Sequence, residues 1–319
     1  MILSTILSFI ISNNFISIGD WGKINKYQGM VSNVAYHYGY NHSTRFIVAL
    51  GDNFYEEGIK NISDPLWETI YKNNDVYKLP IRWNVILGNH DYYGNVSAEI
   101  DYSHYDPKWN LPSKYYSINF NNNTKIVFID TQLLDTECTV TNKDITNQRV
   151  KNDFYEWFDQ ELKTSESMKI IIGHASIYSV GGIHPECKEL RDKMLPILKR
   201  HNIKIYIHGH DHLFQHNVYD GINFIGCGSA AKVVPKSSLK INKKYTKFFK
   251  IDYGFCAHYI HNNRFDTIMI NKNNNIIYKI SIDVGDKILL LVLYIFMWLI
   301  MLALCYTRYN QRRVILMPM

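Results

Sequence analysis

The feature that most constrains this chain is a pattern that recurs five times: an apolar run, then glycine, then aspartate, asparagine or histidine. The five turns are Gly19-Asp20, Gly51-Asp52-Asn53, Gly88-Asn89-His90-Asp91, Gly173-His174 and Gly209-His210-Asp211-His212. Glycine lets the backbone turn sharply where a strand ends, and α/β proteins build their sites at the carboxyl edge of the sheet. One such turn could be ordinary turn chemistry, since Gly, Asn and Asp are turn residues. Five of them predict side chains that share one cleft.

The order of the expected elements predicts the fold class. Strands before these turns alternate with helices over 26–40, 154–162 and 190–198, and a run of strands follows from 222 to 282. Strands that alternate with helices and are followed by more strands predict an α/β sandwich with mixed sheets. The Lys- and Ser-rich stretch 232–250 is expected to be a surface loop.

The residue types at the five turns favour a metal site. Carboxylates, imidazoles and an amide oxygen suit hard or borderline metal ions, and the absence of Cys from these turns argues against a structural zinc site of the Cys type. An aspartate shared by two ions would hold them roughly 3.5–4 Å apart, the spacing of two-metal hydrolysis. Such a pair can clamp a phosphate and lower the pKa of a bound water. The turns therefore predict a phosphate-ester hydrolase.

The same motifs, in their order, resemble the metallophosphoesterase superfamily. Tyr55, in Gly51-Asp52-Asn53-Phe54-Tyr55, narrows the resemblance to purple acid phosphatases of the small, tartrate-resistant type. The resemblance runs from about residue 15 to residue 278 and includes further matches at 106–116 and 129–131. It implies a four-layer α/β/β/α sandwich over residues 13–284.

The resemblance also implies a role for each site residue. Asp20, Tyr55 and His212 would bind Fe(III), Asp52 would bridge, and Asn89, His174 and His210 would bind a divalent Fe, Zn or Mn ion. His90 would contact the phosphate and protonate the leaving oxygen as a general acid. Asp91 would hold His90 in place, and His184 would be a second histidine of the pocket. The chain departs from the family at Ser176, where a proline is common.

The cysteines indicate a non-cytosolic domain. Four of the five, Cys138, Cys187, Cys227 and Cys256, precede the last apolar segment, and four cysteines allow three pairings. The resemblance implies a Cys138–Cys187 disulfide and leaves Cys227–Cys256 as the second pair. Asn-x-Ser/Thr sequons at Asn41, Asn61, Asn95 and Asn122 agree with a lumenal or extracellular location.

The two ends of the chain carry targeting signals. Residues 288–306 are apolar and uncharged, which predicts a single transmembrane helix rather than a buried core helix. Three arginines follow, so the tail 307–319 is expected in the cytosol. Residues 1–12 resemble a short signal peptide without a basic start. Despite the net charge of +6, no basic face with interleaved aromatics supports nucleic-acid binding.

Two functions compete on this basis. The first is a membrane-anchored acid phosphatase that cleaves phosphate monoesters with a metal-bound hydroxide; Tyr55 argues against a phosphodiesterase or nucleotidase, whose relatives lack that ligand. The second is a structural anchor, because the chain also resembles a glideosome-associated branch of the family in apicomplexans at 19–23, 63–67 and 254–258. That branch docks an actomyosin motor to the inner membrane complex. The two functions are compatible, with myosin motor proteins as possible partners.

Overall fold

Two seven-stranded sheets lie at the centre of the protein. The computed structural model describes residues 13–134, 148–181, 184, 186–285 and 295–306. The first sheet runs, in spatial order, β14 (Ile276–Asp283), β13 (Arg264–Asn271), β12 (Gly254–Ile260), β1 (Asn14–Ile18), β2 (Phe46–Leu50), β3 (Arg82–Ile86) and β4 (Trp109–Asn110). The second runs β11 (Thr246–Lys250), β9 (Phe214–Tyr219), β10 (Ile222–Cys227), β8 (Ile205–His208), β7 (Met168–Ile172), β6 (Thr124–Phe128) and β5 (Tyr116–Asn121). Parallel and antiparallel pairs occur in both, which confirms the predicted mixed sheets.

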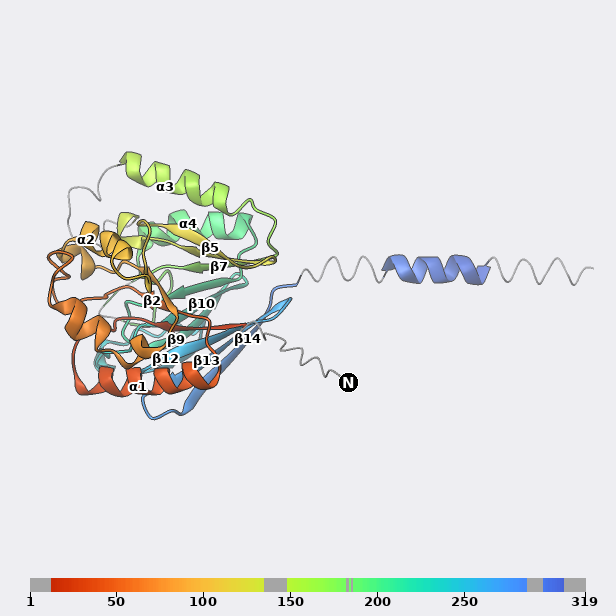
Figure 1. Cartoon of the computed structure of the whole chain (residues 1–319). Coiled ribbons are helices and arrows are strands. Elements are labelled where there is room, and N and C mark those ends of the chain that lie inside the picture. Colours follow the sequence, from red (N-terminus) through yellow and green to blue (C-terminus); the bar gives the residue numbers. More distant parts are fainter. Residues whose placement is uncertain (1–12, 135–147, 182–183, 185, 286–294, 307–319) are drawn as a thin grey trace, which may run out of the picture. The chain divides into compact units, whose positions relative to one another are not determined.

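Helices cover the outer faces of the two sheets (Figure 1). Among the described residues these are α1 (Lys26–Asn41), α3 (Gln148–Glu161) and α4 (Lys188–Arg200), and a short helix, α2 (Val96–Asp101), contacts the edge strand β4. The π-helix η1 (Trp67–Lys72) is as short as α2. Single 3₁₀ turns are η2 (Asp75–Lys78), η3 (Asp91–Tyr93), η4 (Tyr102–His104), η5 (Thr131–Leu133) and η6 (Lys236–Ser238). Helix α1 packs on the first sheet, whereas α3 and α4 lie on the second. The layers follow the expected α/β/β/α order.

The packing explains why the central strands read as continuous apolar runs. All five residues of β1, β2 and β6 are buried, as expected for strands covered on both faces. The helices over the second sheet are instead amphipathic. Phe154 and Phe158 of α3 and Met194 and Leu198 of α4 are fully buried in one cluster with Val127 and other residues of that sheet. This one-sided burial is what holds the helices to the sheet.

The stretch 232–250 differs from the expected surface loop, because its last residues form the edge strand β11. This strand pairs with β9, and Phe248 stacks on Tyr278 with their ring centroids 4.0 Å apart. Lys247 and Lys250 are exposed. A strand with lysines at a sheet edge lacks the apolar run that marks a buried strand, and lysines on edge strands oppose pairing with other chains.

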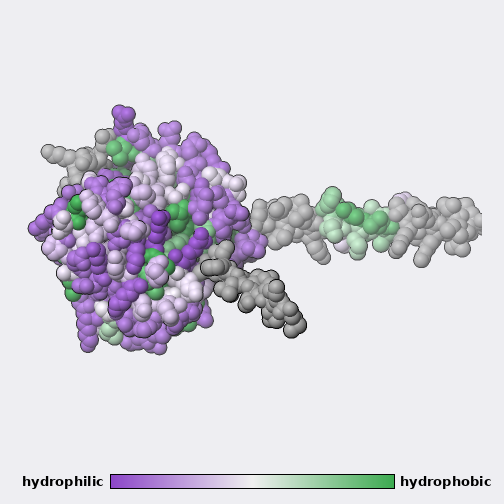
Figure 2. Space-filling model, in the orientation of Figure 1, coloured by the Kyte–Doolittle hydropathy of each residue, from purple (hydrophilic) through white to green (hydrophobic). Residues whose placement is uncertain are grey.

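The last part of the chain, residues 284–319, is a separate unit from residues 1–283. Residues 295–306 are helical, and their large apolar side chains are exposed (Figure 2). No helix in the described ranges is both long and apolar enough to span a bilayer. Residues 288–294 of the expected membrane segment lie outside the described residues, as do the expected signal peptide 1–12 and the tail 307–319.

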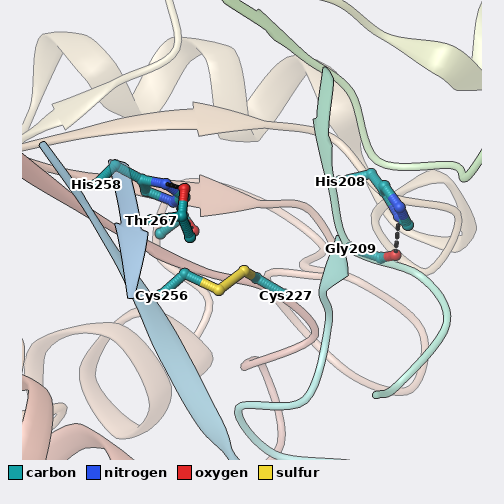
Figure 3. The surroundings of a disulfide bond; sticks show 7 residues. His208, Gly209, Cys227, Cys256, His258 and Thr267 are labelled. Atoms are coloured by element: carbon teal, nitrogen blue, oxygen red, sulfur yellow. Dashed lines mark hydrogen bonds between the residues drawn. A yellow bond between two sulfur atoms is a disulfide. The ribbon is translucent and has the colours of Figure 1, made fainter. Parts of the chain in front are cut away.

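A disulfide bond joins the two sheets. Cys227 at the end of β10 bonds to Cys256 in β12 (Figure 3), which confirms this expected pair. Next to it, the buried ring of His258 lies between Ser17 Oγ at 2.8 Å and Thr267 Oγ1 at 2.9 Å. Of the other expected pair, Cys187 is buried just before α4, and Cys138 lies outside the described residues.

Replacing both Cys227 and Cys256 by serine should lower the free energy of unfolding by about 2–4 kcal/mol. The two cysteines are 29 residues apart in sequence, so the bond restricts a sizeable loop of the unfolded chain. Urea unfolding without reductant, followed by tryptophan fluorescence, measures the change. The matched control is Cys305→Ser, which removes an exposed free thiol and should leave the midpoint unchanged. An unaltered midpoint in the double variant would contradict the expected contribution.

Candidate metal centre

Five strands deliver their polar turns to one place in the molecule. Strands β1, β2 and β3 are parallel neighbours in the first sheet, and β7 and β8 are parallel neighbours in the second. Their carboxyl ends therefore lie together at one edge of each sheet. The backbone N–H of His210, after β8, donates to Asp20 Oδ2, after β1, at 2.8 Å. The turns of the two sheets are thus in direct contact, as the shared-cleft prediction requires.

The first group of side chains centres on the hydroxyl of Tyr55. It donates to Asp52 Oδ2 at 2.6 Å and lies 3.1 Å from Asp20 Oδ1 and 3.2 Å from His212 Nε2. Asp20, Asp52 and His212 each offer a ligand atom, and these atoms lie within 4.8 Å of one another. The structure therefore brings together all four residues predicted for the first ion and the bridge.

The second group consists of Asn89, His174 and His210. The Nδ1 atom of His174 lies 2.7 Å from the carbonyl oxygen of Leu50. Because a carbonyl only accepts, this nitrogen carries a proton, and Nε2 is the ring atom turned toward the other two residues. That Nε2 lies 3.2 Å from Asn89 Oδ1, 3.2 Å from His210 Nδ1 and 3.5 Å from Asp52 Oδ1. Asp52 therefore contacts both groups, as a bridging ligand would.

The backbone at this edge is strained. Asp20, Asp52, His210 and His212 have φ angles of 55°, 52°, 69° and 48°, which non-glycine residues seldom adopt. Strain of this kind costs energy and gathers at functional sites. Gly88 has a different role: a Cβ there would lie 2.3 Å from the backbone N and from Oδ1 of Asp52. Glycine is thus required at this position for the second and third turns to meet.

Burial sets the charge state of these groups. It raises the pKa of Asp20 to about 8 and that of Tyr55 well above its usual value, and the nearby carboxylates add to the shift of Tyr55. Burial also opposes ionisation of Asp52, but the His174 and His90 imidazoles hold its pKa below the usual value. For His212, burial lowers the pKa to about 4, so the ring is neutral, the form that binds metals.

The donor set fits a pair of cations. Asp20 and Asp52 are 0% and 1% exposed, and the described residues place no lysine or arginine in an ion pair with either. Buried carboxylates need a partner of opposite charge or a metal ion. Oxygen and imidazole donors converge on the same space. The described residues contain one other cluster of possible metal ligands, formed by Cys227, Cys256 and His258. Its two sulfur atoms are joined in the disulfide, so they are not available as thiolate ligands.

His90 and Asp91 point in different directions. Nδ1 of His90 lies 2.5 Å from the carbonyl oxygen of Glu56, so it donates there and leaves Nε2 to face another partner. The carboxylate of Asp91, expected to hold His90, instead accepts from the backbone N–H groups of Gly88 at 2.7 Å and Asn53 at 2.8 Å. Asp91 therefore positions the turns that carry Asp52 and Asn89, and Glu56 orients His90.

His184 lies against the histidines that follow β8. Its ring centroid is 4.1 Å from that of His210 and 5.2 Å from that of His212. Burial lowers its pKa to about 4, with the neighbouring His212 adding to the effect. Ser176, the departure from the family pattern, donates to Asp211 Oδ2 at 2.7 Å. This bond ties the His174 turn to the turn that carries His210 and His212.

Sequence reasoning did not identify three residues around this site. Glu56 and Lys232 lie beside Tyr55 and His90, and Glu99 lies behind Asp91, where its carboxylate accepts from Asn53 Nδ2 at 3.1 Å. Glu56 directly follows the predicted ligand Tyr55, and this position in the sequence is the one feature that could have marked it as a site residue. Lys232 belongs to a lysine-rich stretch, and Glu99 is an acidic residue on the short helix α2, so neither carries a pattern that marks it.

Comparisons with known proteins agree with this geometry. Residues 14–214 match the family described as "Calcineurin-like phosphoesterase". Purple acid phosphatase 17 of Arabidopsis thaliana is 30% identical over 265 residues, which cover 77% of this chain and 77% of that protein. Tartrate-resistant acid phosphatase type 5 of Homo sapiens is 28% identical over 267 residues, covering 73% and 78%. A solved structure named "GAP50 the anchor in the inner membrane complex of Plasmodium" superposes with a TM-score of 0.77 at 25% identity, covering 86% and 89%.

Replacing Asp91 by alanine should lower the free energy of unfolding by about 3 kcal/mol or more, because it leaves several buried N–H donors without an acceptor. Chemical denaturation measures the loss. The matched control is Asp101→Ala, which removes an exposed aspartate near the end of α2. The control should stay within about 0.5 kcal/mol of the unsubstituted chain. Equal effects of the two substitutions would show that Asp91 does not have the supporting role described above.

Proposed function

Because the chain belongs to the calcineurin-like phosphoesterase family and is homologous to purple acid phosphatases, we propose that it hydrolyses phosphate monoesters at a centre of two metal ions. The observation that carries the proposal is the position of Asp52. Its carboxylate contacts Tyr55 of the first group and His174 of the second. One carboxylate between two sets of oxygen and nitrogen donors is the arrangement that a bridged pair of ions needs.

The predicted roles of the seven ligands form part of this proposal. Asp20, Tyr55 and His212 would hold Fe(III), Asn89, His174 and His210 would hold a divalent Fe, Zn or Mn ion, and Asp52 would offer a carboxylate oxygen to each. When bound, such ions polarise the phosphoryl group and activate a water molecule. The turns with positive φ at Asp20, Asp52, His210 and His212 hold the donor side chains in place before any ion binds, so the protein needs little reorganisation on binding.

His90 is the residue placed to handle a proton. Its side chain is 18% exposed, so it lies at the open side of the buried cluster. Donation from Nδ1 to Glu56 fixes the ring and leaves Nε2 for the leaving oxygen of the ester. Its backbone N–H donates to Asp52 Oδ1 at 2.9 Å, which ties the acid to the bridging ligand. His184, from the segment between β7 and α4, would complete the pocket around the phosphate.

Metal analysis with a visible absorption spectrum of the purified chain tests this proposal. We expect two metal ions per chain, one of them iron, and a broad band from charge transfer between the Tyr55 phenolate and the iron. Tyr55→Phe should abolish the band, because it removes the phenolate oxygen. Hydrolysis of p-nitrophenyl phosphate gives the accompanying activity.

His90→Ala is the matched variant for this test. It should keep both ions and the band while reducing the turnover number by about 10²–10⁴-fold, the usual contribution of a general acid. A colourless, metal-free and inactive protein would refute the proposed function. Loss of the metals in His90→Ala would instead refute the assignment of His90 as a general acid that does not bind metal.

A second candidate function is that of a membrane anchor, with the phosphatase fold retained. The observation that favours it is the similarity to the structure named as the anchor in the inner membrane complex of Plasmodium. Residues 288–306 would form the membrane helix, with residues 13–284 in a lumenal or extracellular compartment and 307–319 in the cytosol. The tail would then be the part available to proteins of a myosin motor complex. Anchoring and catalysis would occur at different ends of the chain.

Alkaline extraction of membranes tests the anchor. The full chain should stay in the membrane pellet at high pH, whereas a chain ending at residue 284 should be released into the supernatant. For the partner, the full chain should retain a myosin light chain on affinity resin and a chain ending at residue 306 should not. Release of the full chain would contradict anchoring, and equal retention by both chains would contradict a role for the tail.

A further inference from the structure

A lysine lies over the face of the tyrosine that is the candidate metal ligand. Nζ of Lys232 is 3.9 Å from the centroid of the Tyr55 ring, within the range of a cation–π contact. The side chain of Lys232 is 24% exposed, so the ammonium lies at the rim of the site. Tyr55 is itself buried. The contact therefore places a positive charge against the covered ring of a ligand.

Glu56 holds the lysine in this position. Its Oε2 lies 3.1 Å from Lys232 Nζ, and its Oε1 lies 2.6 Å from Nζ of Lys23. One carboxylate cannot neutralise two ammonium groups, so the rim keeps a net positive charge next to Tyr55. Lys23 shares the same acid, but the described contacts place only Lys232 over the ring. The two lysines thus form a natural comparison.

The hydroxyl end of Tyr55 faces two acidic residues. It lies beside the carboxyl groups of Asp20 and Asp52, which, when ionised as metal ligands, would raise the energy of electrons on the ring oxygen. A cation over the ring face acts in the other direction, because it attracts the π electrons. In a phenolate bound to iron, lower-lying ring electrons require more energy for charge transfer to the metal. Lys232 is therefore placed to influence how strongly Tyr55 donates.

We propose that Lys232 is a positioning residue that acts through Tyr55 and moderates its electron donation to the metal ion. The inference rests on the proposed function, since it requires a metal bound by the tyrosine. In this role Lys232 acts through the ring of Tyr55 and not as a ligand of the ion. Its contribution is a fixed positive charge on the ring, held by Glu56, which offsets part of the negative potential of the two carboxylates.

The visible spectrum of the full chain tests this inference with three variants. Lys232→Met removes the charge at similar length and should move the charge-transfer band to longer wavelength, by a shift on the order of 10 nm given the strength of partly buried cation–π contacts. Lys232→Arg restores a cation and should return the band toward its original position. Lys23→Met, the matched control, removes the other partner of Glu56 and should leave the band in place.

The outcomes separate the two proposals. A colourless unsubstituted chain overturns the proposed function and this inference with it. A coloured chain whose band is the same in Lys232→Met overturns this inference alone. A shift in Lys23→Met equal to that in Lys232→Met also overturns it, because the effect would then come from the general charge of the rim. Thermal unfolding of each variant confirms that the fold is intact.

Discussion

Two buried aspartates that pair with no lysine or arginine in the described part of the chain are the constraint on which this structure depends. Asp20 and Asp52 lie at the ends of neighbouring parallel strands, and the hydroxyl of Tyr55 is within hydrogen-bond distance of both carboxyl groups. The other groups that reach them are the backbone N–H groups of His210 and His90 and the imidazoles of His212 and His174. Such an arrangement is unfavourable when both aspartates are ionised, because buried negative charge needs compensation, and burial accordingly raises the pKa of Asp20 to about 8. It becomes favourable when cations supply that compensation, which is why the geometry indicates a metal centre.

The surrounding protein holds this unfavourable group together. Asn53 is the central residue: its side chain accepts from Trp21 and donates to Ile86, Asp91 and Glu99 behind the metal-facing turn. On the other side, the carbonyl of Cys227 accepts from the backbone N–H of Gly19 at 3.1 Å. Cys227, one half of the disulfide that joins the two sheets, is therefore hydrogen-bonded to Gly19, the residue directly before Asp20. The same contacts that close the fold also fix the ligand positions.

Much of the fold and of the metal-facing site could be predicted from the sequence, because each strand and the turn that follows it are encoded by a few consecutive residues. The apolar runs before Gly19, Gly51 and Gly88 correspond to β1, β2 and β3, and all seven expected ligands lie in the two groups. What could not be predicted depends on contacts between distant residues. The bond from Asp91 to Asn53, the position of Lys232 over Tyr55 and the pairing of β11 with β9 each join segments whose proximity no local pattern encodes.

The most direct test of the metal centre is anomalous X-ray diffraction from crystals of the chain grown with iron and zinc. We expect two peaks roughly 3.5–4 Å apart, with Asp52 between them. One peak should lie at Asp20, Tyr55 and His212 and the other at Asn89, His174 and His210. No peak at Asp52, or a single ion bound elsewhere while these side chains keep their mutual hydrogen bonds, would contradict it.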